Sequence, residues 1–266
     1  MFSKTVAKIT VLLIVINGFL NVSINAKEND RIIGGQDVLV EEFPHQVSLR
    51  FKNFHICGGS LLNSRLVLTA AHCVDSYKSS DLPNLNVVLG SSTLNSGGVS
   101  KPFQSFAKHQ YYNRDNLNYD VALVKMNTPV TFTSSIQPIT LSRTNPKEGA
   151  QVYVTGFGVR QNNETESSNK LQGVQLNFIP RAACISPPNK YDPSIVTPVM
   201  SCAGATQKGS CRGDSGGPLT DITTKTLVGI VSWGYICADE GFPGVYANVP
   251  ALRRWIVNSM NIMSRT

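Results

Sequence analysis

Apolar residues in this chain fall in short runs separated by turn-forming residues. From residue 32 onward, Gly, Asn and Ser recur between the runs. Short runs bounded in this way are typical of β-strands, and many of them in succession indicate an all-β barrel or sandwich. The predicted strands lie within Gln46–Phe51, Ser60–Thr69, Val87–Leu89, Val121–Met126, Gln151–Thr155, Val174–Phe178, Thr226–Val231 and Gly244–Asn248.

The two ends of the chain have other patterns. Residues 1–26 begin with two lysines, continue with the apolar run Ile9–Ile16 and close with a polar stretch that ends at Ala26. This order predicts a secretory signal peptide, and the apolar run is too short for a membrane span. At the other end, apolar residues recur at helical spacing and predict a packed helix. They are Leu252, Trp255, Ile256 and Met260.

The composition excludes some classes of protein to which the chain could belong. The formal net charge is +7 over 266 residues, but the basic residues are scattered. We therefore expect no nucleic-acid binding. Six cysteines, an even number, follow the predicted signal peptide, and no Cys-x-x-Cys occurs. Structural disulfides are thus expected instead of a zinc or redox motif, although six cysteines allow about fifteen pairings.

The richest chemistry lies in Gly209–Gly217, where Ser215 is flanked by glycines. A serine nucleophile needs a base and a pair of donors for the oxyanion that it creates. The spacing also fits the nucleophile elbow of α/β-hydrolases, in which the histidine follows the serine. All four histidines of this chain precede Ser215, which excludes that assignment.

A base and an orienting acid can be found upstream. His72 ends an apolar run and is followed by Cys73, which could hold it in place. Asp120 opens the apolar run Val121–Val124, and a carboxylate that enters a core needs a partner to offset its desolvation. His72, Asp120 and Ser215 therefore form a candidate triad in the order His, Asp, Ser.

From Arg31 to the C-terminal helix, the chain resembles the trypsin/chymotrypsin family of serine proteases, most nearly the secreted invertebrate-type chymotrypsins. The resemblance implies two six-stranded antiparallel β-barrels and a C-terminal helix. It divides the chain into a signal peptide (1–26), an activation peptide (27–31) and a protease domain (32–266), with the barrels at about 32–135 and 136–266. The motifs are Ile32–Gly35, Cys57–Ser60, Leu68–Cys73, Asp120–Leu123, Gly213–Pro218 and Ser232–Gly234.

The resemblance also implies an activation switch. Cleavage after Arg31 would free the ammonium of Ile32, which inserts beside Asp214 in this family. Before cleavage, His55 and Ser48 would hold Asp214 in an inactive arrangement. Oxyanion donors would be the N–H groups of Gly213 and Ser215. The family pairing of cysteines is Cys57–Cys73, Cys184–Cys202 and Cys211–Cys237.

In the family, the residue six before the serine lies at the base of the S1 pocket and is Asp in trypsin-like members. Here it is Gly209, followed by Ser210, and Gly234 and Gly244 would form the walls. This predicts a deep uncharged pocket for large apolar residues, with Asp239 or Glu240 as the alternative source of a charge. We assign neighbouring subsites to Trp233, Leu117 and Arg212.

The predicted function is a secreted, extracellular, zymogen-activated serine endopeptidase of digestive type with a chymotrypsin-like preference. The alternatives are a regulatory protease with narrow, elastase- or collagenase-like specificity and a catalytically silent homologue that acts as a binding protein. Expected partners are protein substrates, a trypsin-like activating protease and protein inhibitors. We expect a monomer, no membrane association and no cofactor.

Two further expectations concern metal and sugar. The family's calcium loop follows Gly90, but no Asp or Glu occurs between Asp81 and Asp115. Because calcium sites usually include carboxylates, we expect no metal. Asn163 begins the glycosylation sequon Asn163-Glu-Thr165.

Overall fold

The computed structural model describes residues 32–159 and 166–265. The predicted signal peptide, the predicted activation peptide with Arg31, and Asn163 lie outside the described residues. Within them, no helix is long and apolar enough to cross a membrane.

The first half of the chain forms a closed antiparallel barrel. Its strands follow the order β2-β3-β4-β7-β6-β5. The bounds are β2 Gln46–Phe51, β3 Phe54–Leu61, β4 Leu66–Thr69, β5 Leu85–Leu89, β6 Val99–Lys108 and β7 Ala122–Met126. The apolar run Ser60–Thr69 is divided between β3 and β4, with Leu62 hydrogen-bonded back to Leu66 across the turn.

The second half forms a second antiparallel barrel, closed because β9 pairs with both β10 and β12. Its strands are β9 Gln151–Gly156, β10 Gln172–Ile179, β11 Met200–Gly204, β12 Pro218–Asp221, β13 Thr226–Trp233 and β14 Gly244–Asn248. Two short strands extend this sheet, β1 Gln36–Asp37 along β10 and β8 Thr140–Leu141 along β13. The predicted fold of two six-stranded barrels with a C-terminal helix is therefore confirmed.

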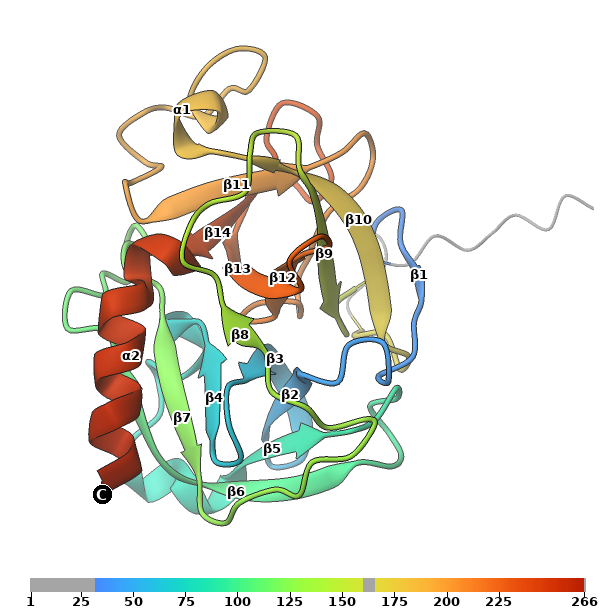
Figure 1. Cartoon of the computed structure of the whole chain (residues 1–266), viewed down its shortest axis with the longest axis vertical. Helices are drawn as coiled ribbons and strands as arrows, with labels where there is room; N and C mark the ends of the chain where they lie inside the picture. Colours follow the sequence, from blue (N-terminus) through green and yellow to red (C-terminus); the bar gives the residue numbers. More distant parts are fainter. Residues whose placement is uncertain (1–31, 160–165, 266) are drawn as a thin grey trace, which may run out of the picture.

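Helical structure is sparse. The C-terminal helix α2, Val249–Arg265, lies along β7 of the first barrel (Figure 1). It buries Leu252, Ile256 and Met263 in the same apolar cluster as the first barrel's core. The remaining helices are the short α1, Arg181–Cys184, and the 3-10 turns η1, Ala71–Cys73, and η2, Ser79–Asn84.

The two barrels approach each other closely where the candidate site lies. A Cβ atom added to Gly58 would come within 2.9 Å of the Cα atom of Gly217, which is shorter than any side chain tolerates. Beside this contact, Thr155 Oγ1 donates a buried hydrogen bond of 2.7 Å to Gln46 Oε1. The close glycine contact and this buried polar pair thus help to join the two barrels.

Candidate active site

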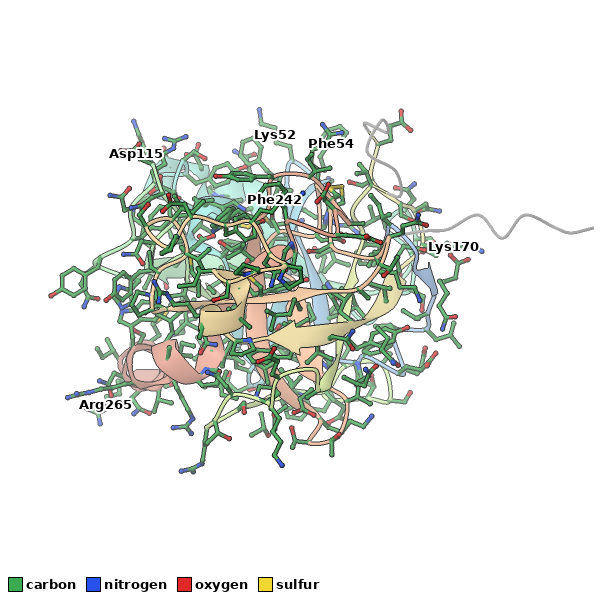
Figure 2. All side chains as sticks on the ribbon, turned by 90° about the horizontal axis from the view of Figure 1, so that it is seen from above. Lys52, Phe54, Asp115, Lys170, Phe242 and Arg265 are labelled. Atoms are coloured by element: carbon green, nitrogen blue, oxygen red, sulfur yellow. A yellow bond between two sulfur atoms is a disulfide. The ribbon has the colours of Figure 1, made fainter. Side chains whose placement is uncertain are left out.

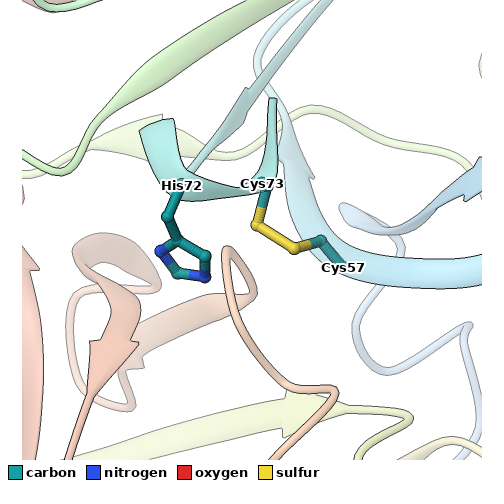
Figure 3. Close-up of side chains that lie close together, drawn as sticks. All are labelled: Cys57, His72 and Cys73. Carbon is teal, nitrogen blue, oxygen red and sulfur yellow. A yellow bond between two sulfur atoms is a disulfide. The ribbon is translucent and has the colours of Figure 1, made fainter. Parts of the chain in front are cut away.

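His72 is held on a rigid turn. It lies in η1, directly after β4, and its neighbour Cys73 is joined to Cys57 of β3 by a disulfide (Figure 3). The imidazole Nδ1 lies 2.7 Å from Asp120 Oδ2, and the backbone N–H of His72 donates to Asp120 Oδ1 at 2.9 Å. With Nδ1–H directed at the carboxylate, Nε2 is left to accept a proton.

Asp120 is 1% exposed and precedes β7. Besides the two donors from His72, it accepts a 2.6 Å hydrogen bond from Ser232 Oγ on β13. Burial of the carboxylate is thus matched by three donors, as desolvation of a charge requires. Nearby, burial and then the negative charges of Asp120 and Asp75 raise the pKa of Tyr112 to about 12, so this phenol stays neutral.

Ser215 sits in a loop braced against the turn that carries His72. Its carbonyl accepts a 2.7 Å hydrogen bond from the N–H of Gly58. The next residue, Gly216, has φ +77°, and a Cβ atom there would lie 3.2 Å from the backbone N of Ala70. The serine loop of the second barrel therefore packs on the residues that immediately precede His72.

The donors for an oxyanion are also available. Gly213 has φ +94°, a conformation that suits glycine. Among the described residues, no backbone oxygen accepts a hydrogen bond from the N–H of Gly213 or of Ser215. Both N–H groups can therefore serve a negatively charged oxygen from outside, as acyl transfer requires.

Asp214 points away from this surface into the second barrel and is fully buried. Its carboxylate accepts 2.8 Å hydrogen bonds from the N–H groups of Gly158 and Cys211. Burial raises its pKa to about 6, against the effect of these two donors. Ile32 is also fully buried, in the apolar core of the same barrel.

Among the described residues, His55 forms hydrogen bonds with Gly213 and Ser48 and none with Asp214. Its Nε2 donates to the carbonyl of Gly213 at 2.9 Å, and its Nδ1 lies 2.9 Å from Ser48 Oγ. Burial lowers the pKa of His55 to about 4, so the ring is neutral near pH 7. His55, itself paired with Ser48, thus holds the loop that contains Gly213.

The candidate S1 residues come together around two glycines that face each other. A Cβ atom on Gly234 would meet only the Cα atom of Gly244, at 3.9 Å. A Cβ atom on Gly244 would lie 3.3 Å from the hydroxyl of Tyr246 and 3.4 Å from Ser210 Oγ. Ser210 and Tyr246 are themselves 3.2 Å apart. Tyr246 was missed by the sequence analysis, although it lies on the same face of β14 as Gly244, two residues along.

Gly209, the residue expected at the base of the pocket, carries no side chain and packs against Ala238. Its missing side chain faces Ala238, whose backbone N would lie 3.2 Å from an added Cβ atom. Gly209, Gly234 and Gly244 all lack the positive φ angles that favour glycine. The absence of a side chain allows close packing at Gly209 and Gly244 and leaves space beside Gly234, whereas the backbone conformation itself does not require glycine.

The acids of the neighbouring loop are placed differently. Asp239 Oδ1 accepts a 2.7 Å hydrogen bond from the N–H of Gly241, and Asp239 also forms a β-bridge with Phe242. The Asp239 carboxylate thus stabilises its own turn. Glu240 is exposed.

An aromatic cluster surrounds the assigned subsite residue Trp233. Its ring centroid lies 5.3 Å from Tyr191 and 5.9 Å from Tyr235, and Phe242 lies 5.3 Å from Tyr191. Tyr191 was missed because it comes from a distant segment, between α1 and β11, whereas Tyr235 and Phe242 lie close to Trp233 in the sequence. Leu117 is partly buried with φ +53°, and Arg212 is exposed. Phe54 projects from the surface at the tip of the β2–β3 hairpin (Figure 2).

Potential metal ligands gather at one place among the described residues, formed by Cys57, His72 and Cys73. The two sulfur atoms are joined in a disulfide and offer no thiolate, so this group does not fit a metal (Figure 3). In the loop after Gly90, hydroxyl groups take the place of carboxylates. Thr93 Oγ1 donates to the carbonyl of Ser96 at 2.9 Å.

The remaining cysteines pair as Cys184–Cys202 and Cys211–Cys237. Together with Cys57–Cys73, these are the pairs that the resemblance implied. The bond from Cys211 to Cys237 ties the start of the serine loop to the segment after Trp233.

Comparison with known proteins agrees with this geometry. Residues 32–256 match the family model described as Trypsin. The chain is 41% identical to trypsin delta of Drosophila melanogaster over 229 residues, which cover 86% of this chain and 88% of that protein. It is 39% identical to trypsin alpha of the same organism over 231 residues (87% and 88%), and 40% identical to trypsin iota over 231 residues (87% and 89%).

Proposed function

Starting from the premise that the chain belongs to the trypsin family of serine endopeptidases, we propose that it cleaves peptide bonds after large apolar or aromatic residues. The proposal includes secretion as a zymogen and a digestive role. Peptide-bond hydrolysis in protein substrates follows from the family. The cleavage preference is argued from the pocket.

The observation that supports this preference is that the residue expected at the pocket base is Gly209, which carries no charge. A Cβ atom on Gly234 would meet only the Cα atom of Gly244, at 3.9 Å, so the space beside Gly234 is open. A Lys or Arg side chain in such a pocket would lose its hydration without gaining a carboxylate, which is costly. A Phe, Tyr, Leu or Met side chain would gain from burial of its apolar surface.

The second candidate is cleavage after Lys or Arg, which is favoured by relatives named trypsins. It requires an acid that reaches the pocket from residues other than Gly209. Asp239 and Glu240 are the acids nearest in sequence to Gly244, but the hydrogen bond to Gly241 engages Asp239 within its own turn.

In the proposed mechanism, His72 takes the proton of Ser215 as the hydroxyl attacks the substrate carbonyl. His72 then returns the proton to the leaving amine, while Asp120 keeps Nδ1 protonated and stabilises the imidazolium. The N–H groups of Gly213 and Ser215 bind the oxyanion, and one such donor contributes about 3 kcal/mol to transition-state stabilisation. Water then attacks the acyl-enzyme, and His72 again takes up a proton and returns it to the leaving group, here Ser215. Trp233, Leu117 and Arg212 would contact neighbouring substrate residues.

Activation is proposed to follow cleavage after Arg31. The freed ammonium of Ile32 would then pair with Asp214, whose buried carboxylate has only backbone donors among the described residues. An uncharged S1 pocket would cleave poorly after arginine, so we assign the activation to a separate trypsin-like protease. In the inactive state, His55 would exchange Gly213 for Asp214 as its partner, and Ser48 would join it in holding Asp214.

The test is cleavage of matched peptides with Phe, Leu, Ala or Arg before the bond, after activation by trypsin and removal of the trypsin. Rapid cleavage after Phe or Leu, lost in Ser215→Ala, is expected. A preference for Arg would replace the proposal with the second candidate. A preference for Ala would support the elastase-like regulatory protease. If no peptide is cleaved although Ile32 is free, the silent homologue is favoured.

A further inference from the structure

A cavity of about 530 Å³ lies where segments of both barrels meet, built from residues outside the candidate active site. Its walls come from the segment before β2, the segment that joins the barrels at β8, and strands β9, β10 and β12. A volume of this size is typical of small-molecule pockets, which are mostly apolar with a few polar groups.

The apolar wall is firmly built. Phe43 stacks on Tyr153 with ring centroids 4.9 Å apart and planes 18° from parallel. Ile139, Ile222 and two prolines complete the lining. Ile139 is anchored through its N–H to the carbonyl of Leu61, and Ile222 to that of Gln151. These contacts present a preformed surface for a flat, apolar group.

The buried polar group of the lining is neutral. His45 is 7% exposed, and burial lowers its pKa to about 4. Its Nε2 lies 3.4 Å from Thr220 Oγ1. A neutral imidazole paired with a hydroxyl places no charge at this part of the cavity.

The charged groups of the lining are Glu42 and Lys225. The Glu42 carboxylate accepts the N–H of Leu39 at 3.3 Å. Lys225 has φ +54° and closes a turn in which its N–H donates to the carbonyl of Asp221 at 2.9 Å. Among residues 32–159 and 166–265, no acidic side chain forms an ion pair with Lys225. The lining thus holds one carboxylate, which accepts a backbone N–H of its own turn, and one exposed ammonium that has no ion-pair partner among these residues.

We propose that this cavity binds a small planar aromatic carboxylate, with its ring against Phe43 and Tyr153 and its carboxylate on Lys225. The ligand would be either a free aromatic acid or the C-terminal aromatic residue of a peptide, since both carry the same two groups. The proposal does not depend on the cleavage preference argued above.

The experiment uses isoleucine methyl NMR signals of the mature Ser215→Ala protein, which cannot digest itself. Indole-3-acetate, its neutral amide and the peptide Gly-Gly-Trp are titrated separately. Ring currents should shift the methyl signals of Ile139 and Ile222, which line the cavity. Ile236, next to Cys237 near the S1 region, reports binding at the active site instead.

The contribution of the Lys225 charge to binding is tested with Lys225→Gln. Lys147→Gln is the matched control, because Lys147 is an exposed lysine outside this lining. Lys225→Gln should weaken indole-3-acetate binding about fivefold and leave the affinity for the neutral amide unchanged. Lys147→Gln should change neither affinity. Shifts caused by Gly-Gly-Trp at the cavity would extend the ligand class to peptide C-termini.

Shifts confined to Ile236, or no shift at Ile139 and Ile222 at millimolar ligand, would overturn the proposed site. Equal binding of acid and amide in the unsubstituted protein would overturn the role of Lys225. The shifts locate binding directly, so neither result depends on catalysis.

Discussion

Asp120 and Asp214 are both almost completely buried, but they are held by different kinds of donor. Asp120 accepts hydrogen bonds from the His72 ring, the His72 N–H and the Ser232 hydroxyl. Within the described residues, Asp214 accepts from two backbone N–H groups, and burial raises its pKa to about 6. An imidazole can act as a general acid or base near neutral pH, whereas a backbone N–H cannot.

This difference separates a carboxylate suited to proton transfer from one suited to a switch. Asp120 orients the His72 ring through one of its three hydrogen bonds. At Asp214, burial outweighs the two backbone donors and raises the pKa, so the charged form would gain strongly from a nearby cation. On the proposed function, the first carboxylate would serve the chemical step, and the second would make the shape of the loop that contains Gly213 depend on the chain end at Ile32.

The largest expected effect is that of removing the charge of Asp120. Asp120→Asn should lower kcat by roughly 10⁴-fold, as in related triads, because the amide favours the wrong tautomer of His72. Steady-state kinetics on a peptide substrate measures this. If kcat falls less than tenfold in a correctly folded variant, Asp120 does not orient the base.

The corresponding substitution in the second barrel is Asp214→Asn. It should act by removing the proposed ion pair between Asp214 and the ammonium of Ile32. After cleavage at Arg31, the buried ammonium of Ile32 would lack its partner, at a cost of about 3–5 kcal/mol. Activity of the cleaved form should fall by at least ~10²-fold. Active-site titration with a serine-directed inhibitor should find few competent sites. Full activity would show that Ile32 does not act through Asp214.

The unfolding free energy of the uncleaved chain should depend on pH because the carboxylate of Asp214 is buried. Its pKa is raised from 3.8 to about 6, so the folded state binds a proton more tightly than the unfolded state between these values. Stability from this group is therefore present below pH 4 and is lost as pH rises through about 6. Relative to Asp214→Asn, the uncleaved chain should lose about 3 kcal/mol of unfolding free energy between pH 4 and pH 7.

Urea unfolding of the two proteins at each pH measures this difference, and the other carboxylates cancel in the comparison. A constant difference across the range would contradict the prediction. In the cleaved enzyme the sign should reverse, because an ammonium beside Asp214 favours the charged form.

The substitution Gly209→Asp adds a new carboxylate to the second barrel. The added side chain needs a shift of a few tenths of an ångström at Ala238, since its Cβ atom would lie 3.2 Å from that backbone N. Cleavage after Phe should fall by about 30-fold, because the pocket then contains a desolvated charge. Cleavage after Lys or Arg should rise in the same variant. Unchanged ratios of kcat/KM would mean that Gly209 does not line the pocket.

The smallest effect concerns the hydroxyl that supports Asp120. Ser232→Ala removes one of three donors, and a hydrogen bond to a charged group contributes about 1.5 kcal/mol. We expect kcat to fall by about tenfold with KM nearly unchanged. Ser201→Ala on β11 is the control, since this buried hydroxyl has no partner within the described residues.

Much of this architecture is encoded locally in the sequence. The apolar runs mark β2, β7, β9 and β13 because these strands bury most of their side chains. Strand β6 was missed because most of its residues are exposed or half-exposed, and its sequence contains Ser, Lys, Pro and Gln. A strand with little burial carries little of the apolar pattern from which strands are predicted.

The sequence by itself determined the reactive groups: a serine among glycines, a histidine beside a cysteine, and an aspartate that opens an apolar run. These are local patterns with a chemical reason. The tertiary structure decided which groups meet, because barrel closure joins segments far apart in the chain. It brought Ser232 to Asp120, Tyr246 to Ser210, Tyr191 to Trp233 and α2 to the first barrel. Such contacts depend on the packing of the whole chain, and no short stretch of sequence contains them.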